Sequence, residues 1–418
     1  MTRMALEHIR IVDLTQAWAG AYATQILADY GAEVIKIEAR QRPDGWRGGV
    51  GASRGYPAYP KEGPGERPHN RAFLANSVNR NKYGITIDLT RNKGRDLLRG
   101  LVRNADVVAE NFTPRVMKNF GLGFEALHEL RPGLIMLSMP AYGSVGPYSL
   151  YPGIGGTIEP MAGNSLLLGY EGGPPMNSGV MYPDPVAGIM GALSVLMAVH
   201  YRARTGRGQH IDLSQHEAMI TMLGYYIVAH SITGETPPKQ GNQDPLLAPH
   251  RNYRCLGDDQ WVAIVARNDA DWAHLCRAMG RPELSGDPRF ASMAARRENH
   301  TVVDLIVEEW TQRRSAEEIE ASLQAVGVPV GKVRNMREIH ACPQLNARRF
   351  FASPVHREVG SRRTAGIPAR LSRSPGAVRW AAPCLGQDSA EVFRRHLGLS
   401  DNEIAKLTEE GITGEEPL

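Results

Sequence analysis

The sequence predicts an α/β fold in which a doubly wound, Rossmann-like and mostly parallel sheet is joined to a second, smaller α+β domain. A βαβ unit opens the chain, strand and helix patterns alternate as far as residue 213, and the pattern changes after the polar stretch 236–251. Strands that alternate with helices favour a mostly parallel sheet. We therefore expect a large domain at residues 1–220, completed by residues 330–418, and a small domain at residues 235–325.

The opening βαβ unit is a strand at 9–14, a helix at 20–30 and a second strand at 32–38. The helix has apolar residues at Ala23, Ile26 and Leu27, which lie on one face. A unit of about 30 residues is the usual start of a doubly wound sheet. Residues 39–72 are rich in Gly, Pro and Arg, so we expect a long irregular excursion there.

The remaining elements follow from apolar periodicity. In the large domain we expect strands at 83–89, 105–109, 134–138 and 210–213, and helices at 93–102, 123–129, 186–199 and 217–232. In the small domain an antiparallel strand pair at 252–255 and 260–265 precedes helices that continue to about residue 325. Helices at 391–397 and 402–409 form the tail.

Composition excludes several classes of protein. The chain has 418 residues, of which 42% are hydrophobic and 22% charged, as in globular proteins with more than one domain. Its longest apolar stretch, 186–199, is shorter than the ~20 residues of a membrane span. The net charge of +4 comes without a basic run interleaved with aromatic residues, so we expect no nucleic-acid partner. Four cysteines without C-x-x-C spacing and no apolar leader favour a reducing cytoplasm.

Asp184 is the first candidate for catalysis. It lies between Pro183 and Pro185, directly before the long apolar helix. A carboxylate at a helix N-terminus, next to a proline that fixes the first helical φ, is held ionised and in one place by the helix dipole. A carboxylate nucleophile needs both properties. The same pattern is typical of a plain N-cap, so only the rest of the chain separates the two interpretations.

Three other chemistries lack their motifs. Glu38 ends the second strand where a ribose-binding acid is expected, but the first turn has one glycine instead of G-x-G-x-x-G, and Trp18 would crowd a pyrophosphate. The 13 histidines include no H-x-x-x-H pair, so we expect no metal site. No G-x-S-x-G motif of a serine hydrolase occurs, and the glycine turn at 153–156 is not followed by the Lys-Ser/Thr of a phosphate loop.

Several segments, in this order along the chain, match one family. They are 11–15 with Gly20, 31–38, Asn81-Lys82 with 87–89, 105–108 with 110–112, 146–148, Asp184 with Gly188, 204–209, 327–331 and 397–400. Together they resemble the class III CoA-transferases, which include formyl-CoA and carnitine CoA-transferases. The likeness covers nearly the whole chain, and Asp184 falls where this family has its nucleophilic aspartate.

The resemblance implies a transfer of CoA from an acyl-CoA donor to a free carboxylic acid through aspartyl anhydride and aspartyl-CoA thioester intermediates. The nucleophile is a carboxylate because the anhydride that it forms keeps the acyl group activated while CoA is transferred from the donor acid to the acceptor acid. The acyl-CoA and the acid are substrates, and no tightly bound cofactor or metal is implied. Residues 169–175 are similar to those of transferases that use succinyl-CoA with aryl- or alkyl-substituted acids.

The resemblance also implies the CoA contacts. They come from the turn after the first strand, the end of the second strand, the stretch after Asn-Lys and the Asn-Phe pair: Ala17, Trp18, Ala39, Arg40, Ile87, Asp88, Leu89, Thr90, Asn111, Phe112 and Thr113. Arg115 and Arg40 are candidates for phosphate contacts, Arg40 because the family often has an arginine where Ala39 stands here. Trp18 and Phe112 are equally compatible with core packing.

The family further implies an interlocked homodimer, with the site between the large domain of one chain and the small domain of the other. From position alone, Tyr142, Glu159, His250 and Arg251 are candidates for the acid pocket. The tetraglycine lid of some members does not occur between 236 and 260.

Two alternatives remain at this stage. The same fold hosts 2-methylacyl-CoA racemases, but the turn Pro152-Gly153-Ile154-Gly155 lacks the His and Asp of their Gly-His-Asp signature. The other alternative is a nonenzymatic acyl-CoA-binding protein.

Overall fold

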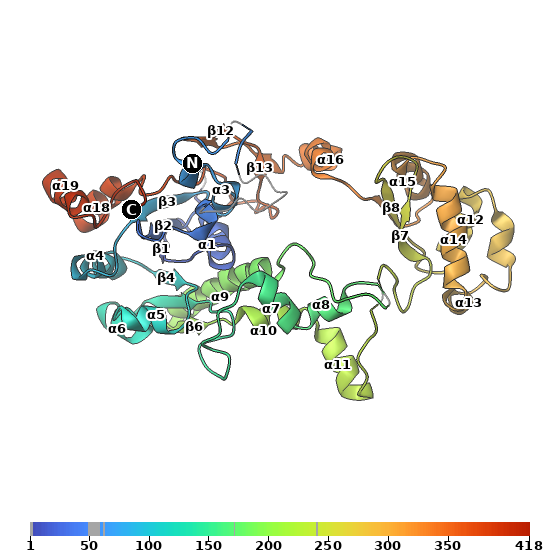
Figure 1. The fold of residues 1–418 in the computed structure, drawn as a ribbon, viewed down its shortest axis with the longest axis horizontal. Coiled ribbons are helices and arrows are strands. Elements are labelled where there is room, and N and C mark those ends of the chain that lie inside the picture. Colours follow the sequence, from blue (N-terminus) through green and yellow to red (C-terminus); the bar gives the residue numbers. More distant parts are fainter. Residues whose placement is uncertain (1–2, 49–58, 62, 171, 240) are drawn as a thin grey trace. The chain divides into compact units, whose positions relative to one another are not determined.

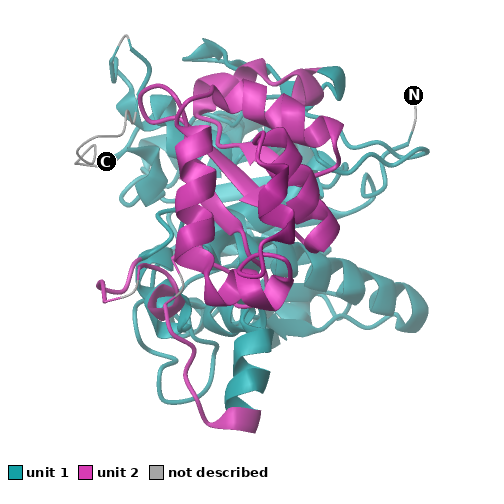
Figure 2. Cartoon of the chain, turned by 90° about the vertical axis from the view of Figure 1, so that its right-hand side faces the viewer, with its two compact units in different colours: residues 1–164, 177–231, 347–418 teal, residues 165–176, 232–346 magenta. Residues whose placement is uncertain are grey.

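The computed structural model describes residues 3–48, 59–61, 63–170, 172–239 and 241–418. The backbone divides into two units (Figure 2): the first contains residues 1–164, 177–231 and 347–418, and the second contains residues 165–176 and 232–346. Compared with the expected range 235–325, the second unit runs on to residue 346 and includes the separate segment 165–176. Residues 49–58 and 62 of the expected irregular excursion lie outside the described residues.

A six-stranded parallel sheet forms the centre of the first unit (Figure 1). Its strands are β1 (Arg10–Asp13), β2 (Glu33–Glu38), β3 (Lys82–Thr86), β4 (Val107–Glu110), β5 (Ile135–Ser138) and β6 (His210–Asp212). The strand order β3-β2-β1-β4-β5-β6 is that of the doubly wound dinucleotide-binding fold. In such sheets ligands bind beyond the carboxyl ends of the strands where the order reverses, which here is between β1 and β4.

Both faces of the sheet are covered by helices, so the inner strands bury apolar side chains on both sides. Val12, Ile35 and Val108 share one core with the helices at 92–103, 389–397 and 401–409. Ile11, Val34 and Val107 face the other side and share a core with the helices at 19–29 and 183–205. Adjacent residues of one strand thus enter different cores, as the two-residue period of a strand requires.

The helices of the first unit are, in chain order, α1 (Ala19–Asp29), α2 (Pro68–Arg71), α3 (Phe73–Ser77), α4 (Asn92–Arg103), α5 (Arg115–Asn119), α6 (Phe124–Leu130), α7 (Gly155–Met161), α9 (Pro183–Thr205), α10 (Gln215–Thr221), α18 (Ser389–Leu397) and α19 (Asp401–Glu409). A 3-10 turn covers Gly45–Arg47, and two short antiparallel pairs join β10 (Phe351–Ala352) to β13 (Thr364–Ala365) and β11 (Val355–His356) to β12 (Gly360–Ser361).

The predicted single helix at 217–232 is wrong, because two helices occupy this stretch. α10 ends at Thr221, and α11 (Gly224–Thr233) begins after a turn. Met222 and Leu223 donate their backbone N–H groups to carbonyls three residues back, and glycine follows at 224. The apolar period continues across this turn, so it did not reveal the break.

The C-terminal tail packs on the β3 edge of the first unit. Gly84 donates its backbone N–H to the Asp388 carboxylate at 2.7 Å, and Phe393 of α18 and Leu407 of α19 are buried in the sheet core. Arg40 donates to the carbonyls of Glu416 and Thr413 at 2.7 and 3.1 Å. The last 30 residues therefore complete this unit.

α9 is the longest helix and has two unlike sides. Gly188 and Gly191 lie against α1, where an added Cβ atom would stand 2.9 Å from the Ala19 carbonyl oxygen and 3.4 Å from the Ala23 Cβ atom, respectively. Large apolar side chains on the other side, Ile189, Leu193 and Met197 among them, are more than half exposed. By length and composition alone α9 is apolar enough to cross a membrane, a test that core helices of soluble proteins also pass.

The second unit is an α+β unit with a three-stranded antiparallel sheet of order β7-β8-β9. Its strands are β7 (His250–Arg254), β8 (Trp261–Val265) and β9 (Val330–Lys332). Its helices are α12 (Asp269–Ala278), α13 (Met293–Glu298), α14 (His300–Thr311), α15 (Ala316–Ala325) and α16 (Met336–Ala341), with a 3-10 turn at Pro282–Gly286. The chain passes from one unit to the other within α8 (Asn164–Leu167), α11 (Gly224–Thr233) and α17 (Pro343–Ala347).

Candidate active site

Asp184 is the second residue of α9. The helix N-cap is Tyr182, which makes no side-chain cap hydrogen bond, and Pro183 is the first helical residue. The backbone N–H of Asp184 donates to the Met181 carbonyl at 3.1 Å, so Asp184 stands inside the first turn and not at the N-cap position. The N-cap interpretation of Asp184 is therefore wrong.

The carboxylate of Asp184 lies against the backbone of Gly155, the first residue of α7. A Cβ atom on Gly155 would stand 2.0 Å from Asp184 Oδ2 and 2.6 Å from the Met181 Cβ atom, so a larger residue here would displace the carboxylate or the helix. Oδ2 is buried and accepts no hydrogen bond from the described part of the chain. A buried acceptor without a donor is costly and is a common mark of a functional group.

Burial raises the pKa of Asp184 to about 6, although the backbone N–H groups of Ala19 and Asp184 oppose the rise. The N–H groups at the two helix ends favour the ionised form, as the sequence led us to expect, but loss of hydration has the larger effect and leaves the pKa above its ordinary value of 3.8. At neutral pH the group is still ionised. Its anion is poorly hydrated, which favours nucleophilic attack.

Asp184 opens into a cavity of about 310 Å³ in the first unit. The lining residues are apolar or neutral and polar apart from the aspartate itself: Gln16, Ala17, Trp46, Asn111, Phe112, Thr113, Pro140, Ala141, Ser149, Tyr151, Gly153, Ile154, Gly155, Met181, Asp184 and Gln215. Among these described residues there is no Lys, Arg or His. The described lining of the cavity therefore supplies no cation that would lower the pKa of Asp184.

Two residues of this cavity have strained backbones. Ala17 and Met181 are not glycine, yet they have φ values of 56° and 53°. Non-glycine residues rarely occupy this left-handed region, and they persist there only when their surroundings hold them. Ala17 precedes α1 and Met181 precedes α9, so the strain occurs where two helices begin beside Asp184.

A second cavity, of about 480 Å³, lies beyond the carboxyl ends of β1, β2, β3 and β4. It is lined by Leu14, Gln16, Ile37, Glu38, Ala39, Gln41, Arg42, Ile87, Asp88, Leu89, Thr90, Phe112, Thr113, Val116 and Phe120. Gln16, Phe112 and Thr113 line both cavities. The two spaces therefore adjoin at the switch point between β1 and β4.

The structure brings most of the sequence-predicted CoA residues to these two cavities. Ala39, Ile87, Asp88, Leu89, Thr90, Phe112 and Thr113 line the larger cavity, and Ala17, Asn111, Phe112 and Thr113 line the cavity of Asp184. Trp18, Arg40 and Arg115 line neither. Trp18 packs on Trp46, whose ring centre is 5.5 Å away, Arg40 holds the C-terminal segment, and Arg115 is exposed at the start of α5.

Polar contacts fix the loops at the switch point. The backbone N–H of Gln16 donates to Asn111 Oδ1 at 2.7 Å, and Asn111 Nδ2 donates to the Gln16 carbonyl at 2.8 Å. Asp44 accepts the backbone N–H of Ala17 at 3.0 Å and is paired with the buried ammonium of Lys36 at 3.3 Å. These bonds hold Ala17 in its strained conformation.

Glu110 is a buried residue of this region to which we assigned no role. Its carboxylate accepts the backbone N–H of Phe112 at 2.8 Å, and burial raises its pKa to about 7. Gln16 and Trp46 are further cavity residues that the sequence did not indicate. In the sequence, Gln16 and Glu110 could have been noticed only because they stand next to predicted CoA residues, namely Ala17 and the Asn111-Phe112 pair.

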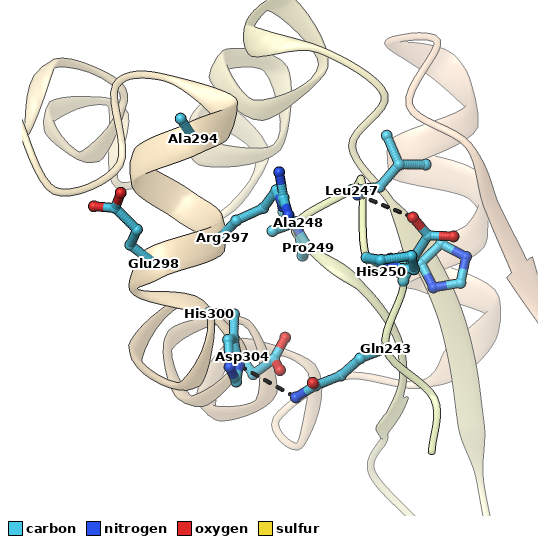
Figure 3. Close-up of a pocket in the computed structure, with 12 residues that line it drawn as sticks. Gln243, Leu247, Ala248, Pro249, His250, Ala294, Arg297, Glu298, His300 and Asp304 are labelled. Atoms are coloured by element: carbon cyan, nitrogen blue, oxygen red, sulfur yellow. Dashed lines mark hydrogen bonds between the residues drawn. The ribbon is translucent and has the colours of Figure 1, made fainter. Parts of the chain in front are cut away.

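The four residues considered for the acid pocket are placed differently. Glu159 is completely buried and Tyr142 nearly so, and neither lines the cavity of Asp184. His250 and Arg251 belong to β7 of the second unit, where Arg251 pairs with Asp304 at 3.5 Å. His250 lines a cavity of about 380 Å³ within that unit, together with His300 and Asp304 (Figure 3).

In the described part of the chain no group of three or more His, Cys, Asp or Glu side chains is arranged to hold a metal ion.

The profile of CoA-transferase family III matches residues 6–389. The succinyl-CoA–D-citramalate CoA-transferase of Chloroflexus aurantiacus is 34% identical over 402 residues, which cover 96% of each chain. The formyl-CoA:oxalate CoA-transferase of Streptomyces avermitilis is 30% identical and covers 98% of this chain and 99% of its own. A crystal structure of a CAIB/BAIF family protein from Brucella suis has a TM-score of 0.84 and 30% identity over 94% of this chain and 99% of its own. The chain therefore belongs to CoA-transferase family III.

Proposed function

We propose that Asp184 is the nucleophile through which this enzyme moves CoA from an acyl-CoA donor to a free carboxylic acid. The observation that carries the proposal is a buried carboxylate oxygen without a hydrogen-bond donor, in a cavity whose described lining contains no cation. Succinyl-CoA is the donor we propose to test first, because it is named for the relatives from Chloroflexus aurantiacus that act on D-citramalate and L-malate.

The first half-reaction releases the donor acid. An oxygen of Asp184 attacks the thioester carbonyl, the carbon–sulfur bond breaks, and the CoA thiolate leaves behind an acyl-aspartyl anhydride. The thiolate then attacks the aspartyl carbonyl, which expels the donor acid and forms an aspartyl-CoA thioester. Because Asp184 is poorly hydrated, little hydration is lost when it attacks.

The second half-reaction is the first in reverse with a new acid. The acceptor carboxylate attacks the aspartyl thioester and displaces the thiolate, and a second anhydride forms. The thiolate attacks the acyl carbon of the acceptor, which produces the new acyl-CoA and restores the Asp184 carboxylate. One oxygen of the acceptor acid remains on Asp184 after each turnover.

We place the pantetheine and nucleotide of CoA in the cavity of about 480 Å³ that adjoins the cavity of Asp184. It lies at the switch point, where doubly wound sheets bind nucleotides, and joins the space of Asp184 through Gln16, Phe112 and Thr113. Of the CoA residues expected from the sequence, we propose those that line the two cavities. Since Arg40 is engaged by the C-terminal carbonyls, we assign the phosphate contact to Arg42.

We further propose a cytoplasmic homodimer, interlocked as the family resemblance implies. The exposed apolar side of α9, together with α11, which has no buried residue, is the surface that a second copy would cover. Light scattering on the purified protein tests this, and a monomer at micromolar concentration would contradict it.

The test of the nucleophile is Asp184→Asn. We expect transfer activity to disappear while acyl-CoA binding persists, because an amide nitrogen does not attack thioesters but occupies the same space. Turnover of the wild-type enzyme with an ¹⁸O-labelled acceptor acid is expected to deposit the label on Asp184, as mass spectrometry of the peptide would show. Full activity of the variant, or label-free Asp184, would contradict the proposal.

The two alternatives are separated by transfer assays and by an assay of α-proton exchange. A binding protein would bind the acyl-CoA without transfer, and a racemase would exchange the α-proton of the acyl group with deuterated water when no acceptor acid is present. A transferase binds the acyl-CoA, transfers its CoA to the acceptor acid and does not exchange the α-proton.

A further inference from the structure

Glu159 of α7 carries a carboxylate with no exposed surface. One oxygen, Oε1, accepts the backbone N–H of Ser178 at 2.8 Å and the side-chain amide of Asn164 at 2.8 Å. The other, Oε2, accepts the Ser178 hydroxyl at 3.1 Å. The carboxyl oxygens of Glu159 accept all three of these bonds.

These hydrogen bonds connect Glu159 to the segment that leads into Asp184. The Ser178 hydroxyl, which donates to Glu159, also accepts the backbone N–H of Val180 at 3.3 Å. Met181 follows with its strained φ of 53°, and its carbonyl accepts the backbone N–H of Asp184 at 3.1 Å. An unfavourable backbone conformation persists only when neighbouring contacts impose it. Glu159 supplies such contacts three residues before Met181.

A second connection runs through the helix itself. α7 begins at Gly155, whose backbone lies against Asp184 Oδ2, and Glu159 is one turn further along the same helix. The side-chain amide of Asn177 donates to the Gly156 carbonyl at 3.1 Å, which adds another link between α7 and the segment before α9. Glu159 thus fixes the distance between the two pieces of backbone that enclose the Asp184 carboxylate.

The partners of the buried Glu159 carboxylate in the described chain are neutral amides and a hydroxyl. Burying a carboxylate with such partners costs folding free energy. An apolar pair of similar shape would join α7 and the segment before α9 at lower cost. We propose that Glu159 is a positioning residue that holds Asp184 in the geometry for attack on the thioester. This inference rests on the proposed function of Asp184.

The test is a steady-state comparison of Glu159→Gln and Ser178→Ala with the wild-type enzyme. Ser178→Ala removes the hydroxyl, and Glu159→Gln replaces the accepting Oε2 with an amide N–H, which cannot accept from that hydroxyl. We expect kcat to fall at least about tenfold in both, since a displacement of about 1 Å in a reacting group costs up to ~100-fold. The KM for acyl-CoA should stay within about twofold, because CoA is bound by the adjacent cavity.

Two controls keep the test specific. Glu217→Gln makes the same chemical change at an exposed position of the neighbouring helix α10, and it should leave kcat unchanged. Thermal melting identifies variants that are merely unstable. Unchanged kcat in both test variants would overturn the inference, as would a joint loss of kcat, acyl-CoA binding and melting temperature. Failure of the nucleophile proposal shows separately, in the Asp184→Asn and ¹⁸O results.

Discussion

Gly155 and Asp184 are in such close contact that a Cβ atom on Gly155 would stand 2.0 Å from Asp184 Oδ2. The glycine turn at 153–156, which showed no phosphate-loop sequence, therefore has another task. It allows the start of α7 to lie directly against the Asp184 carboxylate.

Gly155→Ala should displace the Asp184 carboxylate or α7, because neither can overlap the new methyl group. We expect kcat to fall about 100-fold while acyl-CoA still binds, since loss of orientation at the reacting atom affects mainly the chemical step. The matched control is Gly156→Ala, the next residue of the same helix, where an added Cβ atom meets nothing within 4 Å. Equal activity of the two variants would show that the contact has no consequence for catalysis.

The rate should depend on pH through Asp184. Its pKa is about 6 and the ionised form is the proposed nucleophile, so kcat/KM should be constant above pH ~7 and fall about tenfold per unit below pH ~6. Glu110, with a pKa of about 7, is the nearby group that would confuse this reading. An acid limb that survives in Glu110→Gln belongs to Asp184, and a flat profile down to pH ~4.5 would contradict the prediction.

Asp184→Asn should make the protein more stable at neutral pH. Burial raises the pKa of this acid from 3.8 to about 6 on folding, so the folded state carries the cost of ionisation above pH ~6 and escapes it below pH ~4. The asparagine has no such cost, and a gain on the order of 1–3 kcal/mol is expected at pH ~7.5. Urea denaturation at pH ~7.5 and pH ~4.5 measures it. If Asp184→Asn is less stable than the wild type at both pH values, the ionised Asp184 does not destabilise the folded protein and the prediction fails.

Arg42→Ala and Arg40→Ala should fail in different ways. Arg42 lines the proposed CoA cavity, and its loss should raise the KM for acyl-CoA about tenfold, equal to ~1.4 kcal/mol of binding. Arg40 donates to the carbonyls of Thr413 and Glu416, so its loss should lower stability by about 1–2 kcal/mol and leave KM nearly unchanged. Steady-state kinetics and urea denaturation of both variants check the assignment. A raised KM in Arg40→Ala with an unchanged KM in Arg42→Ala would assign the phosphate contact to Arg40 instead.

The alternation of strands and helices was readable in the sequence because it depends on local periodicity. Each of the six strands of the parallel sheet was expected within a few residues of its place, from β1 at Arg10–Asp13 to β6 at His210–Asp212. The expected helix at 217–232 was wrong because a turn at Met222 and Leu223 does not disturb the apolar pattern. Periodicity describes which face is apolar and carries little information about where the chain bends.

The sequence alone determined the family, the sheet-forming segments and Asp184 as the residue to test, because these depend on local pattern and on the order of motifs along the chain. Only the tertiary structure decided what surrounds that carboxylate. Gly155, Ala17 and Met181 meet Asp184 because α1, α7 and α9 begin at one place, and Glu159 reaches Ser178 across 19 residues of chain. Such contacts follow from long-range packing, which also engaged Arg40 with the C-terminal segment and left Arg42 in the proposed CoA cavity.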